Sequence, residues 1–384
     1  MNILVVDDEP DLSWLIRQKF RKRIRSKEIV FSFAGDGIEA LECLAEDPSI
    51  DIVVTDINMP RMDGLTLLDR LGDWPHPLKV VIVSAYGDMS NIRTAMNRGA
   101  FDFITKPIDF SDLELTLEKT HRELETHRRA ETLQRRVTTL ERELDVARKI
   151  QTSSLPTTFP PFPDRSDFEL HAVMHPAREV GGDFYDFFLL DEHRLGFVLG
   201  DVSGKGLPAA LFMANTRTLL RATALQGMPP DACLRRVNRV LHDERVKGMF
   251  VTLIYGILDV RTGEVAYCNA GHNLPFHLHR RGDVTMLPRA RSLAVCLVAD
   301  FAFPVHTLRL APGDTLFLYT DGVTEAADAN RNQFEDDRLH EHLRSANGAA
   351  PDALIRHVLE AVTAFAGDAP QADDITMLAV RYQA

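Results

Sequence analysis

The chain has 384 residues, of which 45% are hydrophobic and 26% are charged, and its formal net charge at pH 7 is −12. This length and composition predict a folded protein of two or three domains. The acidic balance argues against nucleic-acid binding, and no apolar stretch approaches the roughly 18 residues that a membrane span needs.

The cysteines and the N-terminus bear on the compartment. The four cysteines are far apart and form no C-x-x-C pair, which argues against a zinc site and a disulfide framework: Cys43, Cys233, Cys268 and Cys296. The first residues, "MNILVVDDEP", contain no cationic segment or cleavage site of a signal peptide. We therefore expect a cytoplasmic protein.

Residues 1–120 alternate short apolar strands with amphipathic helices. Strand patterns occur at 2–6, 51–56, 78–85 and 101–107, and segments with helical spacing follow them. This alternation predicts an α/β domain with a doubly wound parallel sheet.

Polar residues stand where these strands end. Asp7 and Asp8 follow the first strand, and Asp56, Ser84 and Lys106 stand at the ends of three later strands. Because function gathers at the carboxyl ends of parallel strands, we expect the five side chains to converge. Three carboxylates together repel unless a cation such as Mg²⁺ offsets them, and a carboxylate beside Mg²⁺ and a lysine can accept a phosphoryl group. A helix N-cap would explain Asp8 alone, but not all five positions.

From Met1 to about Thr120 the sequence closely resembles the receiver domains of two-component response regulators, with Asp56 in "VVTDINMPRMDG". The resemblance implies a flavodoxin-like fold. It also implies that Asp56 is the phospho-acceptor and that the Lys106–Pro107 bond is cis. The other site residues it implies are, for Mg²⁺, Asp7, Asp8, Asp56 and the carbonyl of Asn58; for the phosphoryl group, Ser84 and Lys106; and for the aromatic switch position, Phe103.

Residues 121–152 form a predicted helical linker. No strand signal appears from Ser111 to about Gln151, and the prolines of "SSLPTTFPPFPD" end the helix. An apolar seam with coiled-coil spacing is formed by Leu133, Val137, Leu140, Leu144 and Ala147. The seam is weaker upstream, around His127. We expect a homodimeric coiled coil, because a long helix with one apolar stripe needs a partner; the alternative is a single solvated helix.

Residues 153–384 form a third predicted region, in which strands dominate. Strand patterns occur in "FELHAVMHP", "FYDFFLLD", "LGFVLGDV", "FVTLIYGILDV", "EVAYCNAG", "DTLFLYTDG" and "ITMLAVRY". Helical patterns occur in "LPAALFMANTRTLLRATAL", "PDACLRRVNRVLHDE" and "PDALIRHVLEAVTAFA". This mixture predicts an α+β layered domain.

One device recurs in this region, an apolar run that ends in Asp next to Gly, as in "VGGDFYD", "VLGDVSGKG", "LYTDGVTEA" and "QADDITML". The second of these is not a nucleotide-binding loop, because Gly206 follows Lys205 where a hydroxyl residue is required. Carboxylates from distant strands can instead hold two divalent ions, which activate a water and clamp a phosphoryl oxygen. The sequence has neither a Cys-x5-Arg loop nor a G-x-S-x-G elbow.

These segments resemble metal-dependent protein serine/threonine phosphatases of the PPM superfamily (the protein phosphatase 2C type), and best the bacterial branch in partner-switching control of sigma factors. The resemblance runs from about Leu144 to Tyr382 and includes "ARKIQTSSLP", "GKGLPAALFMA" and "NAGHNLP". It implies a layered β-sandwich fold and a site for two Mn²⁺ or Mg²⁺ ions. The residues it implies are Asp183, Asp201 and the Val202 carbonyl for both metals, Asp321 and Asp373 to complete the shell of one, and Asp374 in support.

Several residues fit the family pattern less well. Ala294 and Val295 replace a family "LG" stretch, and Glu335 stands where a glycine is common. We expect Lys205 to be a solvated turn residue. His272 in "NAGHN" is either close to the metal site or a structural histidine at a strand end. His277 and His279 share one face of a strand, and with no third ligand nearby we expect both to be structural.

Together these features predict a response regulator whose output is a phosphatase. A sensor histidine kinase or phosphotransfer protein would phosphorylate Asp56, and the helix would carry the change to the phosphatase. By family analogy, the substrate would be a phosphoserine or phosphothreonine protein of the STAS-type anti-sigma-factor antagonist class. The alternative is a non-catalytic adaptor or sequestering regulator with a degenerate phosphatase domain, which would typically have lost metal carboxylates. A DNA-binding output is not supported, because no basic recognition helix is evident.

Overall fold

The computed structural model describes residues 1–85, 87–244, 248–289 and 291–383. The chain divides into two compact units, Met1–Thr139 and Leu140–Ala384. The boundary falls within one long helix, α6 (Phe110–Ser154). The three-part division at residues 120 and 152 remains a prediction.

The first unit is built on a parallel sheet of five strands in the order β2-β1-β3-β4-β5. Its strands are β1 (Asn2–Val6), β2 (Val30–Ala34), β3 (Ile52–Asp56), β4 (Lys79–Ala85) and β5 (Asp102–Lys106). Ile3 and Val5 pack into one core and Leu4 and Val6 into another, because successive side chains of a strand point to opposite faces. The expected flavodoxin-like sheet is confirmed.

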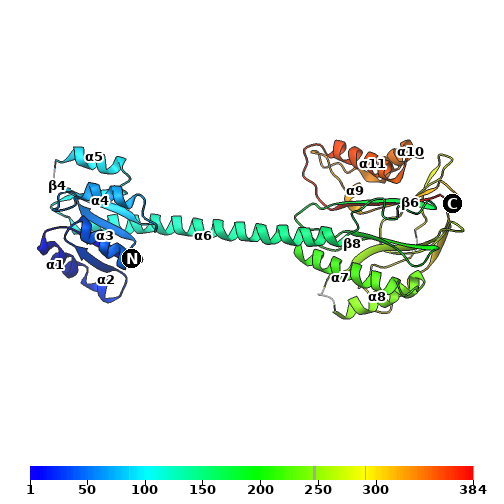
Figure 1. The fold of residues 1–384 in the computed structure, drawn as a ribbon, viewed down its shortest axis with the longest axis horizontal. Coiled ribbons are helices and arrows are strands. Elements are labelled where there is room, and N and C mark those ends of the chain that lie inside the picture. Colours follow the sequence, from blue (N-terminus) through cyan, green and yellow to red (C-terminus); the bar gives the residue numbers. More distant parts are fainter. Residues whose placement is uncertain (86, 245–247, 290, 384) are drawn as a thin grey trace. The chain divides into compact units, whose positions relative to one another are not determined.

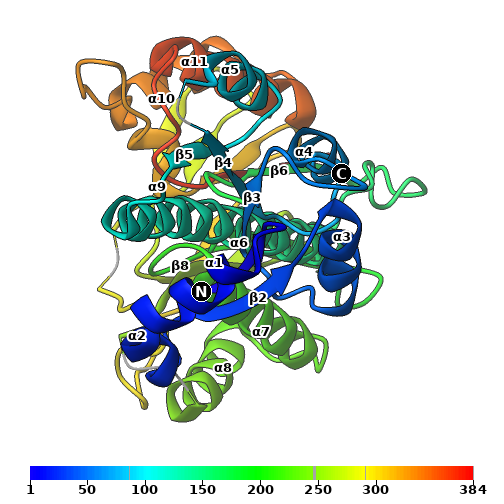
Figure 2. The ribbon, with the colours of Figure 1, turned by 90° about the vertical axis from the view of Figure 1, so that its left-hand side faces the viewer.

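Helices cover both faces of this sheet. They are α1 (Pro10–Lys19), α2 (Arg21–Arg25), α3 (Gly37–Glu46), α4 (Gly64–Leu71), α5 (Met89–Asn97) and the first part of α6. Figure 2 shows the strands side by side, with α3 and α4 along one side of the sheet. Leu44 of α3 and Leu67 of α4 lie in one core, whereas Ile16 of α1 and Leu117 of α6 lie in the other.

The first part of α6 belongs to the receiver-like unit. Leu124 is only 1% exposed. Arg128 Nη1 lies 2.6 Å from Asp51 Oδ1, and its Nη2 donates to the carbonyl of Pro77 at 3.2 Å. The apolar seam predicted from sequence begins just beyond these contacts, at Leu133, which is 63% exposed.

The second unit contains two antiparallel sheets of five strands, in the orders β13-β10-β9-β8-β7 and β12-β11-β14-β15-β6. The first sheet comprises β7 (Phe184–Leu189), β8 (Arg194–Val202), β9 (Val251–Asp259), β10 (Glu264–Ala270) and β13 (His306–Arg309). The second comprises β6 (Phe168–His175), β11 (Phe276–Leu278), β12 (Val284–Met286), β14 (Thr315–Tyr319) and β15 (Ile375–Tyr382).

Helices lie outside both sheets, so the unit has four layers (Figure 1). Those on the first sheet are α7 (Leu207–Ala224) and α8 (Pro230–Glu244); those on the second are α9 (Asp321–Thr324), α10 (Glu335–Ser345) and α11 (Pro351–Ala366). Leu199 and Leu318 lie in the core that joins the two sheets, whereas Phe317 and Val358 lie in the core between the second sheet and its helices. The predicted layered β-sandwich is confirmed. In the part of the chain described, no helix is long and apolar enough to cross a membrane.

Candidate functional site

The carboxyl edge of the receiver-like sheet brings its polar residues together. One carboxylate oxygen from each of Asp7, Asp8 and Asp56 lies within 4.8 Å of the others. Lys106 reaches this group from the end of β5, with Nζ 2.6 Å from Asp56 Oδ2 and 3.0 Å from Asp7 Oδ2. The same ammonium lies 3.1 Å from Glu9 Oε1, a partner that the sequence analysis did not identify.

The charges at this edge are strongly coupled. Burial raises the pKa of Asp7, against the opposing effects of the Glu9 backbone N–H and of Lys106. Burial lowers the pKa of Lys106, but its hydrogen bonds to Asp56, Asp7 and Glu9 outweigh burial and raise it overall. One ammonium thus pairs with three carboxylates, and Asp8 adds a fourth beside them. This oxygen-rich set suits a hard divalent cation such as Mg²⁺.

The remaining receiver positions surround Asp56. Its Oδ1 accepts the backbone N–H of Ile57 at 2.6 Å and faces that of Asn58 at 3.4 Å. Ser84 is fully buried, and its Oγ has no hydrogen-bond partner within the described residues. Phe103 on β5 is 37% exposed. The expected cis bond between Lys106 and Pro107 is confirmed.

In the second unit, four segments of the two sheets carry the predicted metal carboxylates. Asp183 precedes β7, and Asp201 lies near the end of β8; Asp321 begins α9 just after β14, and Asp373 precedes β15. Asp183 is 2% exposed, and its Oδ2 accepts the hydroxyl of Thr320 at 2.7 Å.

The pKa values of these groups show how closely the negative charges are packed. Burial, followed by repulsion from Asp201, raises the pKa of Asp183 well above its usual value. Burial and the charge of Asp321 raise the pKa of Asp201 to about 7. Burial, with the charges of Glu325 and Asp373, raises the pKa of Asp321 to about 6. Such a group is unfavourable without cations, so these side chains fit divalent metal ions.

Asp374 plays a different part, because backbone N–H groups occupy both of its oxygens. Its Oδ1 accepts from Ala177 at 2.8 Å, and its Oδ2 accepts from Gly182 at 2.7 Å. The carboxylate therefore ties β15 to the loop before Asp183, which agrees with a supporting position.

Two glycines of the Asp-Gly motifs are required by close approach to Asp374. A Cβ on Gly181 would lie 2.2 Å from Asp374 Oδ2, and one on Gly322 would lie 2.0 Å from the Asp374 backbone oxygen. Both distances are shorter than any real carbon contact, so a larger residue at Gly181 would displace the Asp374 carboxylate and one at Gly322 would displace its backbone. Gly182 is similarly close to Val202, since its Cβ would lie 2.8 Å from the carbonyl oxygen at the end of β8.

Lys205 is exposed in a turn, as expected from sequence, but its ammonium also has partners that the sequence did not reveal. Its Nζ lies 2.8 Å from Asp373 Oδ2 and donates to the carbonyl of Ala372 at 2.6 Å. The left-handed glycines on either side, Gly204 and Gly206, form the turn from which it reaches across. The ammonium offsets part of the charge at Asp373.

His272 is buried beside the strand that carries Asp201. Its Nδ1 lies 2.9 Å from the hydroxyl of Thr252, and Thr252 pairs with Asp201 in the register of β8 and β9. Burial lowers the pKa of His272 to about 4, so its imidazole is neutral near pH 7. His272 thus contacts the residue that pairs with Asp201, and a position close to the metal site stays a prediction.

At or beside the positions where the sequence departs from the family glycine pattern, the backbone adopts the left-handed conformation. Glu335 has a φ of 64°, and Cys296, which follows Ala294 and Val295, has a φ of 75°. Both values fall in the left-handed region that glycine occupies most readily.

Comparison with known proteins identifies both units. The model of the response regulator receiver domain matches residues 3–118, and that of Stage II sporulation protein E (SpoIIE) matches residues 191–383. The chain therefore belongs to the SpoIIE family and carries a response regulator receiver domain ahead of its SpoIIE domain.

Three similar proteins show how far the likeness extends. Protein IcfG of Synechocystis is 35% identical over 62% of this chain and 41% of its own length. Phosphoserine phosphatase RsbU of Bacillus subtilis is 27% identical over 50% of this chain and 56% of its own length. The SiaA-PP2C domain of Pseudomonas aeruginosa, a solved structure, is 23% identical, covers 64% of this chain and 98% of its own, and has a TM-score of 0.57. It shows a shared PP2C fold, whereas the chain spans about half the length of the curated relatives it matches.

Proposed function

We propose that this protein is a response regulator whose second unit is a metal-dependent protein serine/threonine phosphatase controlled by phosphorylation of Asp56. The observation that supports it most is the group of carboxylates contributed by four segments, in which burial and mutual repulsion raise the pKa values of Asp183, Asp201 and Asp321. Such a group is costly in an apolar fold unless it serves a cation site. The phosphoserine phosphatase activity in the name of RsbU supports the same reaction here.

In this proposal Asp183 and Asp201, with the Val202 carbonyl, hold two Mn²⁺ or Mg²⁺ ions, and Asp321 and Asp373 complete one shell. The metals, when bound, supply an activated water and charge stabilisation for the phosphoryl oxygens. Thr320 orients Asp183 through its 2.7 Å hydrogen bond, and Asp374 fixes the loop before Asp183. Lys205 holds Asp373, and neutral His272 supports the Asp201 strand through Thr252.

The receiver would accept the phosphoryl group on Asp56 Oδ2, the oxygen now paired with Lys106. Asp7, Asp8, Asp56 and the Asn58 carbonyl would hold Mg²⁺. The buried hydroxyl of Ser84 has no other partner within the described residues, which suits a contact to the incoming phosphoryl group. Phe103 on β5 would report the change as the aromatic switch.

The partners are part of the proposal. A sensor histidine kinase or phosphotransfer protein would donate the phosphoryl group, and the substrate would be a phosphorylated STAS-type antagonist of an anti-sigma factor. We also propose a homodimer through α6, since its residues beyond the receiver expose apolar side chains, among them Leu133, Leu140 and Ile150.

The test is phosphate release from a panel of phosphoserine STAS proteins, with Mn²⁺ or Mg²⁺, by the full chain. We expect metal-dependent release that is lost in chelator. If the chain binds a phosphoprotein tightly but releases no phosphate with either metal, the adaptor function is correct and the enzyme function is wrong.

A further inference from the structure

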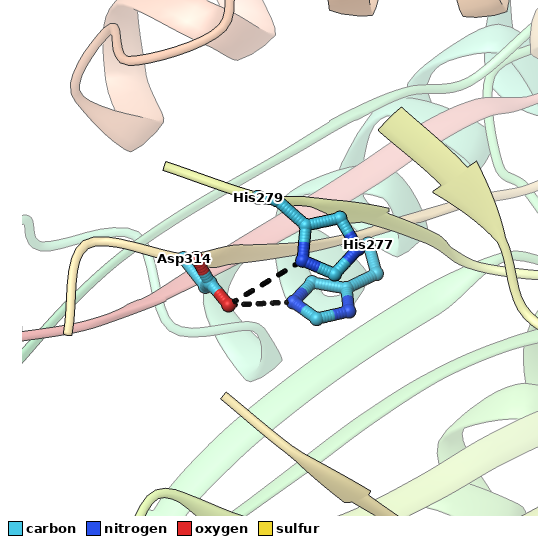
Figure 3. Close-up of side chains that lie close together, drawn as sticks. All are labelled: His277, His279 and Asp314. Carbon is cyan, nitrogen blue, oxygen red and sulfur yellow. Dashed lines mark hydrogen bonds and ion pairs between the residues drawn. The ribbon is translucent and has the colours of Figure 1, made fainter. Parts of the chain in front are cut away.

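A second cluster of ligand-type side chains lies elsewhere in the phosphatase-like unit (Figure 3). His277 of β11 and His279 just beyond it share one face of their strand, and Asp314 immediately precedes β14. His277 Nε2 lies 2.9 Å from Asp314 Oδ2, and His279 Nδ1 lies 3.8 Å from the same oxygen. One ligand atom from each lies within 4.8 Å of the others. The expectation that no third ligand is nearby was wrong, because Asp314 is distant only in sequence.

The cluster lies far from the proposed phosphatase metals. Asp314 and Asp321 stand at opposite ends of β14, seven residues apart, which corresponds to roughly 20 Å of extended chain. His277 pairs with Leu316, and its neighbours Phe276 and Leu278 pack toward the helices of the second sheet. The two histidines therefore face the other side of that sheet.

Backbone N–H groups hold the carboxylate of Asp314 in addition to its hydrogen bond with His277. Asp314 Oδ1 accepts the backbone N–H of Arg280 at 2.8 Å, and Oδ2 accepts that of Ala311 at 3.0 Å. The side chains of Asp314 and His277 are 6% and 5% exposed, and that of His279 is 36% exposed. Two ligands are thus fixed in the interior, and the third opens to solvent, which gives an ion a path of entry.

The contacts of His279 orient it as a ligand. Its Nδ1 is too far from Asp314 for a direct hydrogen bond, whereas its Nε2 lies 3.3 Å from the hydroxyl of Thr285. If Nε2–H donates to Thr285, the lone pair of Nδ1 points toward His277 and Asp314. A hydrogen bond on the far nitrogen is the usual way in which proteins fix a metal-binding histidine.

We propose that His277, His279 and Asp314 bind one Zn²⁺-type divalent transition metal, with a fourth position open to water. Two imidazoles and one carboxylate form a familiar zinc ligand set. The ligand type separates this site from the carboxylate centres at Asp56 and Asp201, because imidazole favours Zn²⁺ whereas oxygen-only sets suit Mg²⁺ and Mn²⁺. The bound ion would join β11 to the start of β14 and stabilise the folded unit by mass action.

The test is a Zn²⁺ titration of the full chain without a histidine tag, measured by calorimetry. Excess Mg²⁺ is present throughout, so that the carboxylate centres are already filled. We expect one Zn²⁺ per chain, with an affinity at least about 10-fold weaker in His279→Ala and in Asp314→Asn. His279→Ala is the main variant, because its half-exposed side chain is not part of the packed core. His193→Ala, which removes an exposed histidine outside the cluster, should bind as the wild type does.

Two further readouts separate a metal ligand from a structural residue. Co²⁺ in place of Zn²⁺ should give visible absorption in the wild type and lose it in His279→Ala, while circular dichroism confirms that both are folded. Zn²⁺ should also raise the midpoint of thermal unfolding in the wild type but not in His279→Ala. The proposal is overturned if Zn²⁺ affinity is the same in wild type, His279→Ala and Asp314→Asn, or if the wild type binds no Zn²⁺ in excess Mg²⁺.

Discussion

The side chain of Gln151 and the backbone of Gly181 form a two-way hydrogen bond. Gln151 Nε2 donates to the Gly181 carbonyl at 2.6 Å, and the Gly181 N–H donates to Gln151 Oε1 at 3.1 Å. Gln151 lies in the last turns of α6, and Gly182, the next residue of the loop, donates to Asp374. The end of the linker helix is thereby joined to the loop that positions Asp183.

The first prediction concerns this contact. Gln151→Leu leaves a buried N–H and carbonyl of Gly181 without partners, which costs about 1–3 kcal/mol locally. The loop before Asp183 should shift, and since misplacement by about 1 Å can cost 10²-fold, we expect the phosphatase rate to fall by at least about 10-fold. Ser153→Ala, at an exposed position two residues on, is the control and should keep its rate. An unchanged rate in Gln151→Leu would show that α6 does not act through Gly181.

The second prediction concerns the phosphatase carboxylates. Asp201→Asn and Asp321→Asn should each abolish Mn²⁺-dependent hydrolysis without unfolding the chain, because each removes an anionic ligand from a two-metal centre. Asp368→Asn, at an exposed position, should be fully active. Full activity in both site variants would contradict the two-metal proposal.

The third prediction follows from the raised pKa values and applies to the chain stripped of metal by chelator. The pKa of Asp201 is about 7 and that of Asp321 about 6 in the fold, above their ordinary value of 3.8. Between pH 4 and 7 the folded chain therefore binds more protons than the unfolded chain, so its free energy of unfolding falls as pH rises. Asp201→Asn should reduce this dependence and be more stable than wild type at pH 8.

The two units allow an internal control for that experiment. Both tryptophans, Trp14 and Trp74, belong to the first unit, so tryptophan fluorescence follows its unfolding while circular dichroism follows both units. Asp201→Asn should change the free energy of unfolding measured by circular dichroism, by on the order of 1 kcal/mol or more, and leave the value from tryptophan fluorescence unchanged. Equal pH dependence in wild type and variant would mean that Asp201 is not the perturbed group.

The fourth prediction concerns the receiver. Acetyl phosphate should label the chain with an acyl phosphate that hydroxylamine removes, and Asp56→Ala should prevent labelling, because Asp56 presents an oxygen to Lys106 at the edge of the sheet. Asp73→Ala, at an exposed position, should be labelled normally. Persistence of the label in Asp56→Ala would place the acceptor elsewhere.

The sequence predicted the main carboxylates of the candidate sites but not all of their partners. Asp56 and Asp201 could be found because each ends a strong apolar strand pattern, and such patterns report burial directly. The partners of Lys205 and of Gln151 could not, because contacts across 168 and 30 residues depend on how the sheets and loops assemble. The contact of Asp314 with His277 could not be predicted for the same reason.

Some helices and strands could also not be predicted from the hydrophobic pattern. The strands β12 and β13 are only three and four residues long and partly exposed, so alternation has too few positions to show. α10 is dominated by charged residues, with Leu339 and Leu343 its buried side chains, and thus lacks a clear apolar stripe. The burial of Leu124 ahead of the predicted seam was also not evident, because sequence spacing alone does not reveal which part of a long helix is covered.

The last prediction concerns the exposed part of α6. Leu133, Val137 and Leu140 are 63%, 46% and 51% exposed, and a partner helix is the simplest way to cover such a stripe. Replacing Leu140 and Leu144 together by Ser should weaken dimerisation and uncouple the phosphatase rate from phosphorylation of Asp56. Sedimentation measures dimerisation, and the phosphatase rate with and without acetyl phosphate measures the response to phosphorylation.

The control is the double variant Arg142→Ser with Glu143→Ser. It places the same two serines outside the stripe, with a similar change in helix propensity and no change in net charge. This control should remain dimeric and responsive, so a loss seen only in the leucine variant belongs to the apolar stripe. A leucine variant that is monomeric yet fully responsive would show that the signal does not require pairing of α6.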